Sequence, residues 1–552
     1  MRNVARDALS AFIYAGSHPL KTVRAAIEYK NEGTAYQNWL AGGGANATMV
    51  AIDRRYIDAH LYDLEPKTHL LARGWNVVKS PLELLRIMSE TMENVTRLGI
   101  GVNALKVAQT KAQMQAIAML TREGTVDFAR HGADPFIYNW TRSTAFMNPA
   151  LQGVDRMVRA FKDNPAGTSA KAIASITIPS VLLWWANKDD PRWAQIPDWK
   201  RDLTWVLFTD KWEKPKNMAD YAAHQKIGLT KEIDGVSYVN NGYTFTWPKP
   251  FELGVLFGSV PERLLDAYVK DNPEAFKDFG KTLANIFSFN VTPTALLPPL
   301  QQMTNYNFFT ERPLVPDFMK TILPEYQYTP YTTETTKKLG ALIGSIPGMK
   351  TSSFASPIVI DNYIRGWSGT LGTYAVELAD IALRQAGIIP DPIRPAKTLA
   401  DYPVIRAFMV RFPSAQAQSI QDFRDDYARA KTIVDTVNYL AKALDPVSMR
   451  KELELGKTQY VSKIDGIEQS LSQMQQVIQL IDKNPKLSAD EKRQIIDTTY
   501  LQMIAVARAG NEAIQRIKSI VDAQQKAPPA SPQVTLPPPR RIEGASVGAT
   551  AQ

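Results

Sequence analysis

Residues 464–491 read IDGIEQSLSQMQQVIQLIDKNPKLSADE, and this stretch decides the fold class. Its apolar side chains are spaced alternately three and four residues apart, which is the a/d spacing of a helix that packs against another helix. We predict that six of these residues form an assembly interface, either within the chain or with the helices of a partner. They are Ile464, Ile467, Leu471, Met474, Ile478 and Ile481.

The residues that follow predict a long helical hairpin. Asn484 and Pro485 break the first helix, and Ser488-x-x-Glu491 is a capping box that starts the second. The expected helices cover residues 459–481 and 490–524, inside a C-terminal helical and coiled-coil region over 395–527. Beyond it, prolines and small polar residues predict a disordered tail over 528–552.

The amino-terminal residues 1–145 are predicted to form a region of amphipathic helices. Ser80 is a helix cap followed by Pro81 at the first helical position, and apolar residues then recur at helical spacing. Gly99 and Gly101 have no third glycine and no strand before them, so they predict a helix break and not a dinucleotide-binding loop.

The central residues 146–390 are rich in tryptophan and proline and are predicted to form a separate domain. Within it, VSYVNNGYTFTW (236–247) places Asn241-Gly242 between two runs of strand-forming residues, which predicts a β-hairpin. The expected fold is therefore mainly α and multi-helical, with a small β-hairpin in the central domain and a long C-terminal helical hairpin.

Two uncharged stretches, residues 172–187 and 282–310, raise the question of a membrane segment. The first is short for a spanning helix, which needs about 20 apolar residues, and both contain prolines. The sequence favours buried segments of a soluble domain for both. Four tryptophans are predicted to be either core residues or membrane-interface anchors: Trp184, Trp185, Trp193 and Trp199.

The composition excludes several kinds of site. The 552 residues contain no cysteine, which removes disulfides, thiol nucleophiles and cysteine-ligated metals. The five histidines lack metal-ligand spacing. A net charge of +9 is compatible with DNA or an anionic membrane as a neighbour, and equally with an ordinary solvated surface.

No arrangement of residues predicts catalysis. The chain has no phosphate-binding loop and no G-x-S-x-G motif. Glu90 and Glu93 are better interpreted as surface charge, and Asp189-Asp190-Pro191-Arg192 as a turn that caps a helix. We therefore predict no enzyme and no catalytic, cofactor-binding or metal-ligating residue, and no cofactor. Two carboxylates that meet in space would still suffice for a glycoside hydrolase.

Five segments around the central region carry a resemblance to a known family: 128–165, 177–207, 246–267, 293–316 and 344–380. Their most specific motifs are Asn187-x-Asp189-Asp190-Pro191-Arg192, Trp199-Lys200-Arg201-Asp202, Pro248-x-Pro250-Phe251-Glu252 and Asn307-x-x-Thr310-x-Arg312-Pro313. Together these segments resemble the large polyvalent protein-associated domain 38 of long phage proteins that are packaged in the virion.

The resemblance implies an internal virion (ejection) protein, as in podovirus-like phages. Such a protein is a structural, oligomeric component of a genome-delivery conduit across the host envelope. It is located in the virion, inside the capsid or at the portal, and then in the host envelope. The implied partners are further copies of the chain and other virion or ejection proteins, with phage DNA and the host membrane as additional candidates.

Three alternatives remain open at the level of sequence. The protein could be a portal-associated or tail-associated structural protein that stays in the particle. It could be a cell-wall hydrolase, against which the missing catalytic residues argue. It could also bind nucleic acid alone, which a steep salt dependence of DNA binding would reveal.

Overall fold

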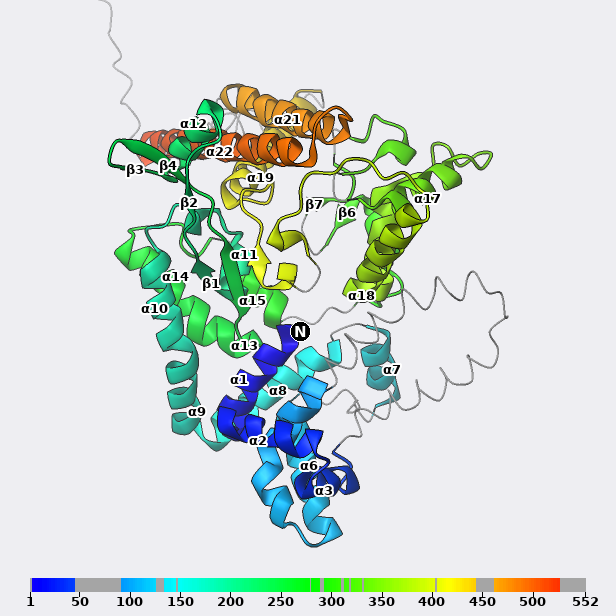
Figure 1. Cartoon of the computed structure of the whole chain (residues 1–552). Helices are drawn as coiled ribbons and strands as arrows, with labels where there is room; N and C mark the ends of the chain where they lie inside the picture. The colour runs from blue at the N-terminus through cyan, green and yellow to red at the C-terminus, as the bar shows by residue number, and fades with distance from the viewer. Residues whose placement is uncertain are drawn as a thin grey trace, which may run out of the picture. The chain divides into compact units, whose positions relative to one another are not determined.

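The computed structural model describes residues 2–44, 91–125, 134–144, 147–277, 279–287, 292–308, 312–316, 319–329, 332–402, 405–442 and 461–526 (Figure 1). Helices dominate these ranges and the strands are short and antiparallel, so the predicted mainly α fold is confirmed. The chain divides into two compact units, residues 1–422 with 469–507 and residues 423–468 with 508–552. The division into four regions stays a prediction.

The amino-terminal helices enclose a small core. Trp39 is fully buried there, and its indole Nε1 donates to Thr121 Oγ1 at 2.9 Å. Residues 91–107 form one helix that runs through Gly99 and Gly101, so the helix break predicted there is wrong. Ser80 and Pro81 lie outside the described residues. The helices here are α1 (Arg2–Ala15), α2 (Pro19–Lys30), α3 (Thr34–Ala41), residues 91–107, α6 (Lys111–Glu123) and α7 (Pro135–Ser143).

The middle of the chain is a succession of helices interrupted by short strands. Two of its elements, η2 and η4, are π-helical turns within longer helices, and the others marked η are 3₁₀ turns. The elements up to residue 287 are α8 (Met147–Asp163), α9 (Pro165–Ala172), η2 (Ile173–Thr177), α10 (Ile178–Asn187), η3 (Trp193–Gln195), α11 (Asp198–Leu203), α12 (Met218–Ile227), α13 (Phe251–Gly254), η4 (Val255–Ser259), α14 (Val260–Val269) and α15 (Phe279–Phe287).

The remaining elements continue the helical pattern. The long helix α18 is interrupted at Gly369, which has a positive φ of 61°. The elements are α16 (Leu297–Thr304), η6 (Pro324–Tyr326), α17 (Glu334–Gly344), η7 (Ser353–Ala355), α18 (Pro357–Gln385), η8 (Leu399–Asp401), η9 (Ile405–Ala407), α19 (Gln418–Lys442), α21 (Val461–Lys483) and α22 (Ala489–Lys526).

The strands form three small antiparallel sheets. Their orders are β1-β5-β8, β2-β4-β3 and β6-β7. The strands are β1 (Thr204–Phe208), β2 (Trp212–Glu213), β3 (Thr230–Ile233), β4 (Val236–Asn240), β5 (Thr244–Pro248), β6 (Tyr306–Asn307), β7 (Arg312–Pro313) and β8 (Met409–Val410).

The predicted hairpin over 236–247 has the right strands and the wrong pairing. Strands β4 and β5 belong to different sheets, and β4 instead pairs with β3 across a turn at Asp234 and Gly235. Both turn residues have positive φ, 51° and 73°, which is typical of a two-residue hairpin turn. Gly242 lies where the chain passes from β4 in one sheet to β5 in another. Only glycine fits there, because a Cβ would lie 1.7 Å from the carbonyl oxygen of Thr209.

The C-terminal helical hairpin is confirmed. Helices α21 and α22 match the expected ranges within two residues at each end. The predicted capping box is present, since Glu491 N donates to Ser488 Oγ at 3.3 Å and Ser488 N donates to Glu491 Oε2 at 2.9 Å. The predicted tail over 528–552 lies outside the described residues.

Candidate functional site

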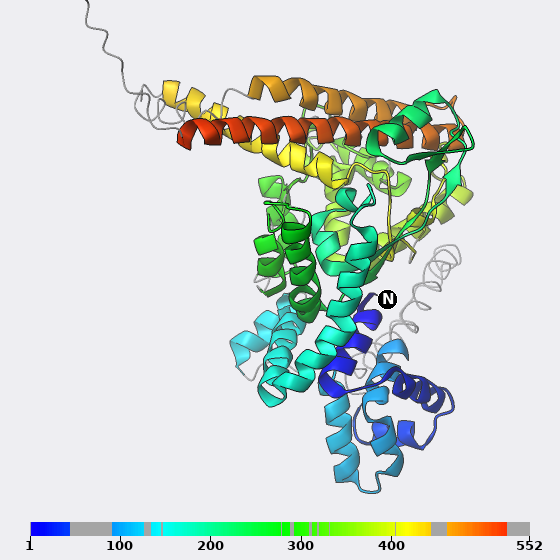
Figure 2. The ribbon, with the colours of Figure 1, turned by 90° about the vertical axis from the view of Figure 1, so that its left-hand side faces the viewer.

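Two proline-bearing helices of the larger unit pack against each other through matching irregular turns. Pro179 and Pro261 each follow a π-helical turn, η2 and η4. Proline lacks an N–H and its ring clashes with the carbonyl four residues earlier, and a π turn accommodates both. Segments α9, η2 and α10 remain one continuous helix (Figures 1 and 2). At the crossing, a Cβ on Gly258 would lie only 2.8 Å from Ser180 Oγ.

In the helix that ends with α10, polar side chains face inward and apolar side chains face outward, the reverse of an ordinary surface helix. Its buried positions from residue 172 to residue 187 include the polar side chains of Ser180 and Asn187. Every exposed position in this range carries an apolar residue, whereas a helix at a water-facing surface carries polar residues there. These exposed residues are Ile173, Ala174, Ile178, Leu182, Trp185 and Ala186.

The second helix, α13–η4–α14, shows the same reversal more strongly. Residues 251–269 contain four charged side chains, Glu252, Glu262, Arg263 and Asp266, and all four are buried. The exposed positions carry only large apolar or aromatic residues, namely Phe251, Leu256, Leu264, Tyr268 and Val269. We call residues 165–187 and 251–269 the inverted helix pair.

A buried ionic network satisfies the charges that point inward. The guanidinium of Arg263 donates to both carboxylate oxygens of Asp202, at 2.9 and 3.0 Å. Lys249 Nζ lies 2.7 Å from Glu262 Oε2 and also donates to a backbone carbonyl at 3.1 Å. Since a buried charge is tolerated only when it is paired, these contacts explain how the pair can face charged residues inward.

The network also connects the two helices of the pair. Trp184 Nε1 in α10 donates to Asp266 Oδ1 in α14 at 2.9 Å. Burial raises the pKa of Glu262 to about 7, against the opposing effect of the Lys249 ammonium group. The motif residue Asp202 and position 249 inside the Pro248–Glu252 motif therefore serve the packing of this domain.

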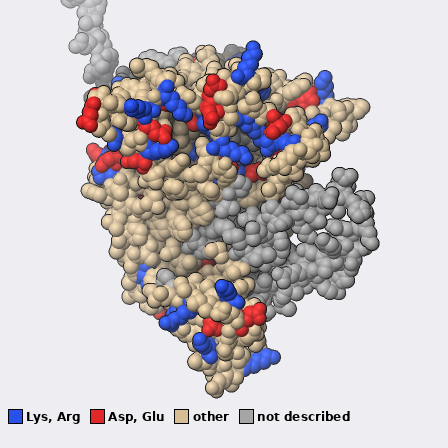
Figure 3. Space-filling model, in the orientation of Figure 1, with Lys and Arg blue, Asp and Glu red and all other residues tan. Residues whose placement is uncertain are grey.

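The outer surface of the pair is a continuous uncharged area. Figure 3 shows the region over α10 and α13 free of Lys, Arg, Asp and Glu, with charged side chains at its margins. Among the described residues, Pro165–Asn187 is the one helix long and apolar enough to cross a membrane, with 22% of its most apolar window buried. At 1.5 Å per residue its 23 residues span roughly 35 Å, against about 30 Å for a bilayer core.

One end of this surface combines tryptophan with lysine. Lys188 Nζ lies 5.1 Å from the ring centroid of Trp185 at the end of α10 and is paired with Asp189. In α11, Lys200 Nζ lies 5.8 Å from the ring centroid of Trp199. Amphipathic aromatic rings beside lysines are typical of the boundary between lipid tails and anionic headgroups.

The four predicted tryptophans separate into two groups. Trp184 and Trp193 are buried core residues, exposed by 0% and 4%. Trp185 and Trp199 are exposed by 59% and 43%, so they are available as interface anchors. The prediction that 172–187 is a buried segment is wrong for its outer face, because Ile178, Leu182 and Trp185 are each more than half exposed.

The six predicted interface residues of α21 alternate in burial. Ile464, Leu471 and Ile478, seven residues apart, are at most 1% exposed within the single chain, and the other three are half-buried. In the smaller unit, a Cβ on Gly510 would lie 3.3 Å from Ile467 Cγ2. Packing inside the chain accounts for the buried three, and an interface with a partner stays a prediction.

The His, Asp and Glu side chains of the described ranges form no metal site, since no group of three or more of them could hold a metal ion. His224 is buried and bonded to Asp220 and Asn241, which is a structural role. The inward-facing residues Ser259, Glu262, Arg263 and Asp266 escaped the sequence analysis, although their helical spacing in an apolar segment is a signal that could have revealed them.

Comparison with known proteins identifies one domain. Residues 190–405 match the family model described as large polyvalent protein associated domain 38. This match confirms the resemblance over those residues, which include the motifs at 199–202 and 248–252, and it indicates a phage-associated protein. No curated protein and no solved structure matches the chain.

Proposed function

We propose, from the phage-associated domain at residues 190–405, that this chain is an internal virion (ejection) protein of a bacteriophage. In this proposal it is an oligomeric, structural component of a genome-delivery conduit across the host envelope. It is carried in the virion, inside the capsid or at the portal, and reaches the envelope on infection. The observation that carries the proposal is the inverted helix pair.

The pair suits a lipid bilayer for a simple physical reason. Lipid tails form no hydrogen bonds, so a segment in contact with them must direct its polar groups inward and pair them with one another. The outer residues Ile178, Leu182 and Trp185 present only apolar surface, while Glu262 and Arg263 are satisfied inside. In this arrangement the Trp185 end, with Lys188 and Lys200, contacts anionic headgroups.

A conduit also requires subunits and companions. One inverted helix pair cannot enclose a channel, so several copies of the chain, together with other virion proteins, would share the assembly. The half-buried residues Ile467, Met474 and Ile481 on α21 remain available for such contacts. The net charge of +9 favours a non-specific electrostatic attraction to the genome.

The test is flotation of the purified chain with vesicles that contain phosphatidylglycerol, followed by light scattering of the floated fraction. We expect a defined oligomer that floats. The double variant Leu182→Asp/Trp185→Asp should fold, because both side chains are more than half exposed, and its floating fraction should fall at least about tenfold, since each charge is costly in lipid.

The matched control is Leu20→Asp/Val23→Asp, which introduces the same charges at equally exposed apolar positions of α2. This control should float like the unmodified chain. Equal flotation of both double variants would assign the membrane contact to another surface. An unmodified chain that remains a monomer and ignores vesicles would contradict the conduit and favour a structural protein that stays in the particle.

A further inference from the structure

A pocket of about 320 Å³ lies in the larger unit, well away in sequence from the inverted helix pair. The second half of α18 forms one wall, residues 394–406 form another, and α21 with the start of α22 closes the bottom. This volume is at the lower end of the range for small-molecule sites, about 300–1,000 Å³, and is much larger than the space that one water needs.

The bottom of the pocket is apolar. Ile478, Ile496 and Tyr500 line it and are each at most 2% exposed. Leu378 and Ile381 of α18 extend this apolar lining, and Ile381 is 39% exposed, so it lies toward the mouth. Such a lining favours an alkyl or aromatic group over a fully hydrated ligand.

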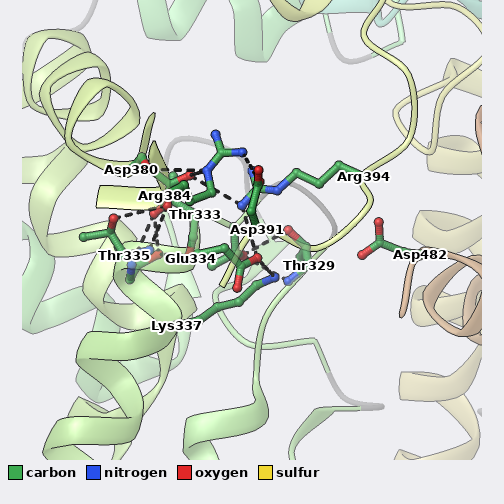
Figure 4. A network of polar contacts seen from close by, with 12 residues as sticks. Thr329, Thr333, Glu334, Thr335, Lys337, Asp380, Arg384, Asp391, Arg394 and Asp482 are labelled. Carbon is green, nitrogen blue, oxygen red and sulfur yellow. Dashed lines mark hydrogen bonds and ion pairs between the residues drawn. The ribbon is translucent and has the colours of Figure 1, made fainter. Parts of the chain in front are cut away.

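Ion pairs fix the polar wall of the pocket. Figure 4 shows Arg384 and Arg394 converging on the buried carboxylate of Asp380, with N–O distances of 3.0 and 3.5 Å. Arg394 also reaches Glu334 Oε1 at 3.1 Å, and Arg384 reaches Asp391 Oδ1 at 2.8 Å. These pairs hold the wall in place through Nε and Nη1 of Arg384 and through Nη2 of Arg394.

Lys397 and part of the Arg406 guanidinium group remain for a ligand. Five cationic side chains line the pocket, and the fifth, Arg493, is held by Asp401 and Asp497. Lys397 is exposed and makes no ion pair with any described residue, although its Nζ lies 5.8 Å from the ring centroid of Tyr402. Arg406 uses Nη1 for Glu377 Oε1 at 2.7 Å and also bonds Tyr374, which leaves the other N–H groups of its five-donor fork.

We propose that this pocket binds a small amphipathic anion, with its alkyl or aromatic part against Ile478 and Ile496 and its carboxylate or phosphate group at Lys397 and Arg406. The apolar bottom supplies affinity for the body of the ligand, and the two cations select for negative charge by charge-assisted hydrogen bonds. The headgroup could come from a fatty-acid carboxylate or from a phospholipid-type phosphate, which share this chemistry.

Calorimetric titration of the full chain with octanoate and with octyl phosphate tests the proposal. We expect saturable binding of one molecule per chain. Whichever of octanoate and octyl phosphate binds more tightly identifies the preferred headgroup. Octanol and octylammonium, which keep the alkyl chain and lack the negative charge, should bind at least about tenfold more weakly. Equal binding of octanol, or no binding of either anion, would overturn the proposal.

Two variants locate the ligand. Ile381→Trp fills the mouth of the pocket and should abolish binding, and Lys397→Ala should weaken the anions at least threefold and leave octanol unchanged. Their controls are Ile346→Trp and Lys350→Ala, at exposed positions that do not line the pocket. Undiminished binding to the Ile381→Trp variant would place the ligand elsewhere and refute this site.

This inference stands independently of the envelope conduit. The Leu182→Asp/Trp185→Asp variant should bind octanoate like the unmodified chain, and the Ile381→Trp variant should still float with vesicles. Loss of octanoate binding in the first of these variants would assign the anion to the inverted helix pair and overturn the pocket.

Discussion

Glu262 connects the buried network to the pH of the surroundings. Burial raises its pKa from 4.5 to about 7, so the folded protein holds a proton at pH values where the unfolded chain has released it. The stabilisation is fully present below pH 4.5 and is lost as the pH rises through 7. The size of this effect is on the order of 3 kcal/mol between pH 4.5 and pH 8.

We therefore expect the Glu262→Gln variant, which keeps a neutral hydrogen-bonding side chain, to lose less stability than the unmodified chain between pH 5 and pH 8. Urea unfolding at both pH values measures this difference. Glu232→Gln, at an exposed position in β3, is the control and should follow the unmodified chain. If the unfolding free energy of the Glu262→Gln variant depended on pH as that of the unmodified chain does, protonation of Glu262 would not contribute to stability.

At the scale of elements, the crossing of the two π-bulged helices depends on Gly258. A Cβ at this position would lie 2.8 Å from Ser180 Oγ and 3.2 Å from Ile176 Cγ2. We expect Gly258→Ala to lower the free energy of unfolding by about 1–3 kcal/mol, since overpacking forces the helices apart. Urea denaturation provides the measurement.

The matched substitution is Gly280→Ala in α15, where a Cβ meets no atom within 4 Å. This variant should be neutral or more stable by up to about 1 kcal/mol, because alanine favours a helix over glycine. If the two alanine variants proved equally stable, close approach at the crossing would not hold the pair together.

The predicted interface residues of α21 give a second prediction at this scale. Leu471 is fully buried and Leu480, on the same helix, is 68% exposed. Leu471→Ala should cost about 2–5 kcal/mol of unfolding free energy, and Leu480→Ala should change it by less than about 0.5 kcal/mol. If the Leu471→Ala variant kept the unfolding free energy of the unmodified chain but became a monomer in light scattering, this face of α21 would instead join subunits.

At the scale of the whole molecule, local patterns were sufficient for the helices but not for the sheets. The heptad spacing from Ile464 to Ile481 and the capping box at Ser488 depend on near neighbours, and both predicted the hairpin correctly. The partner of β4 could not be decided locally, because Asp234-Gly235 and Asn241-Gly242 offer equally good turns. The contact of Gly242 with Thr209, 33 positions earlier, decides between them.

The candidate site was only half visible in the sequence for a related reason. The uncharged run from Ala172 to Asn187 marked an unusual helix, but the direction of its faces depends on which neighbour holds the charges. Glu262 and Arg263 of α14 find their partners, Lys249 and Asp202, in other segments of the chain, so these charges are paired only after folding. A charged residue in a sequence favours the surface by default, so the reversal becomes evident only from the packing.

The fixed orientation of the inverted helix pair has a practical consequence for handling the protein. Turning α10 to hide Leu182 would break the Trp184–Asp266 hydrogen bond, and turning α14 to hide Leu264 would separate Glu262 and Arg263 from Lys249 and Asp202. The exposed face is therefore not concealed by rotation. Solubility in plain buffer is then limited by the adhesion of these faces to one another. A mild non-ionic detergent, added from the first purification step, should raise the concentration at which the protein stays monodisperse.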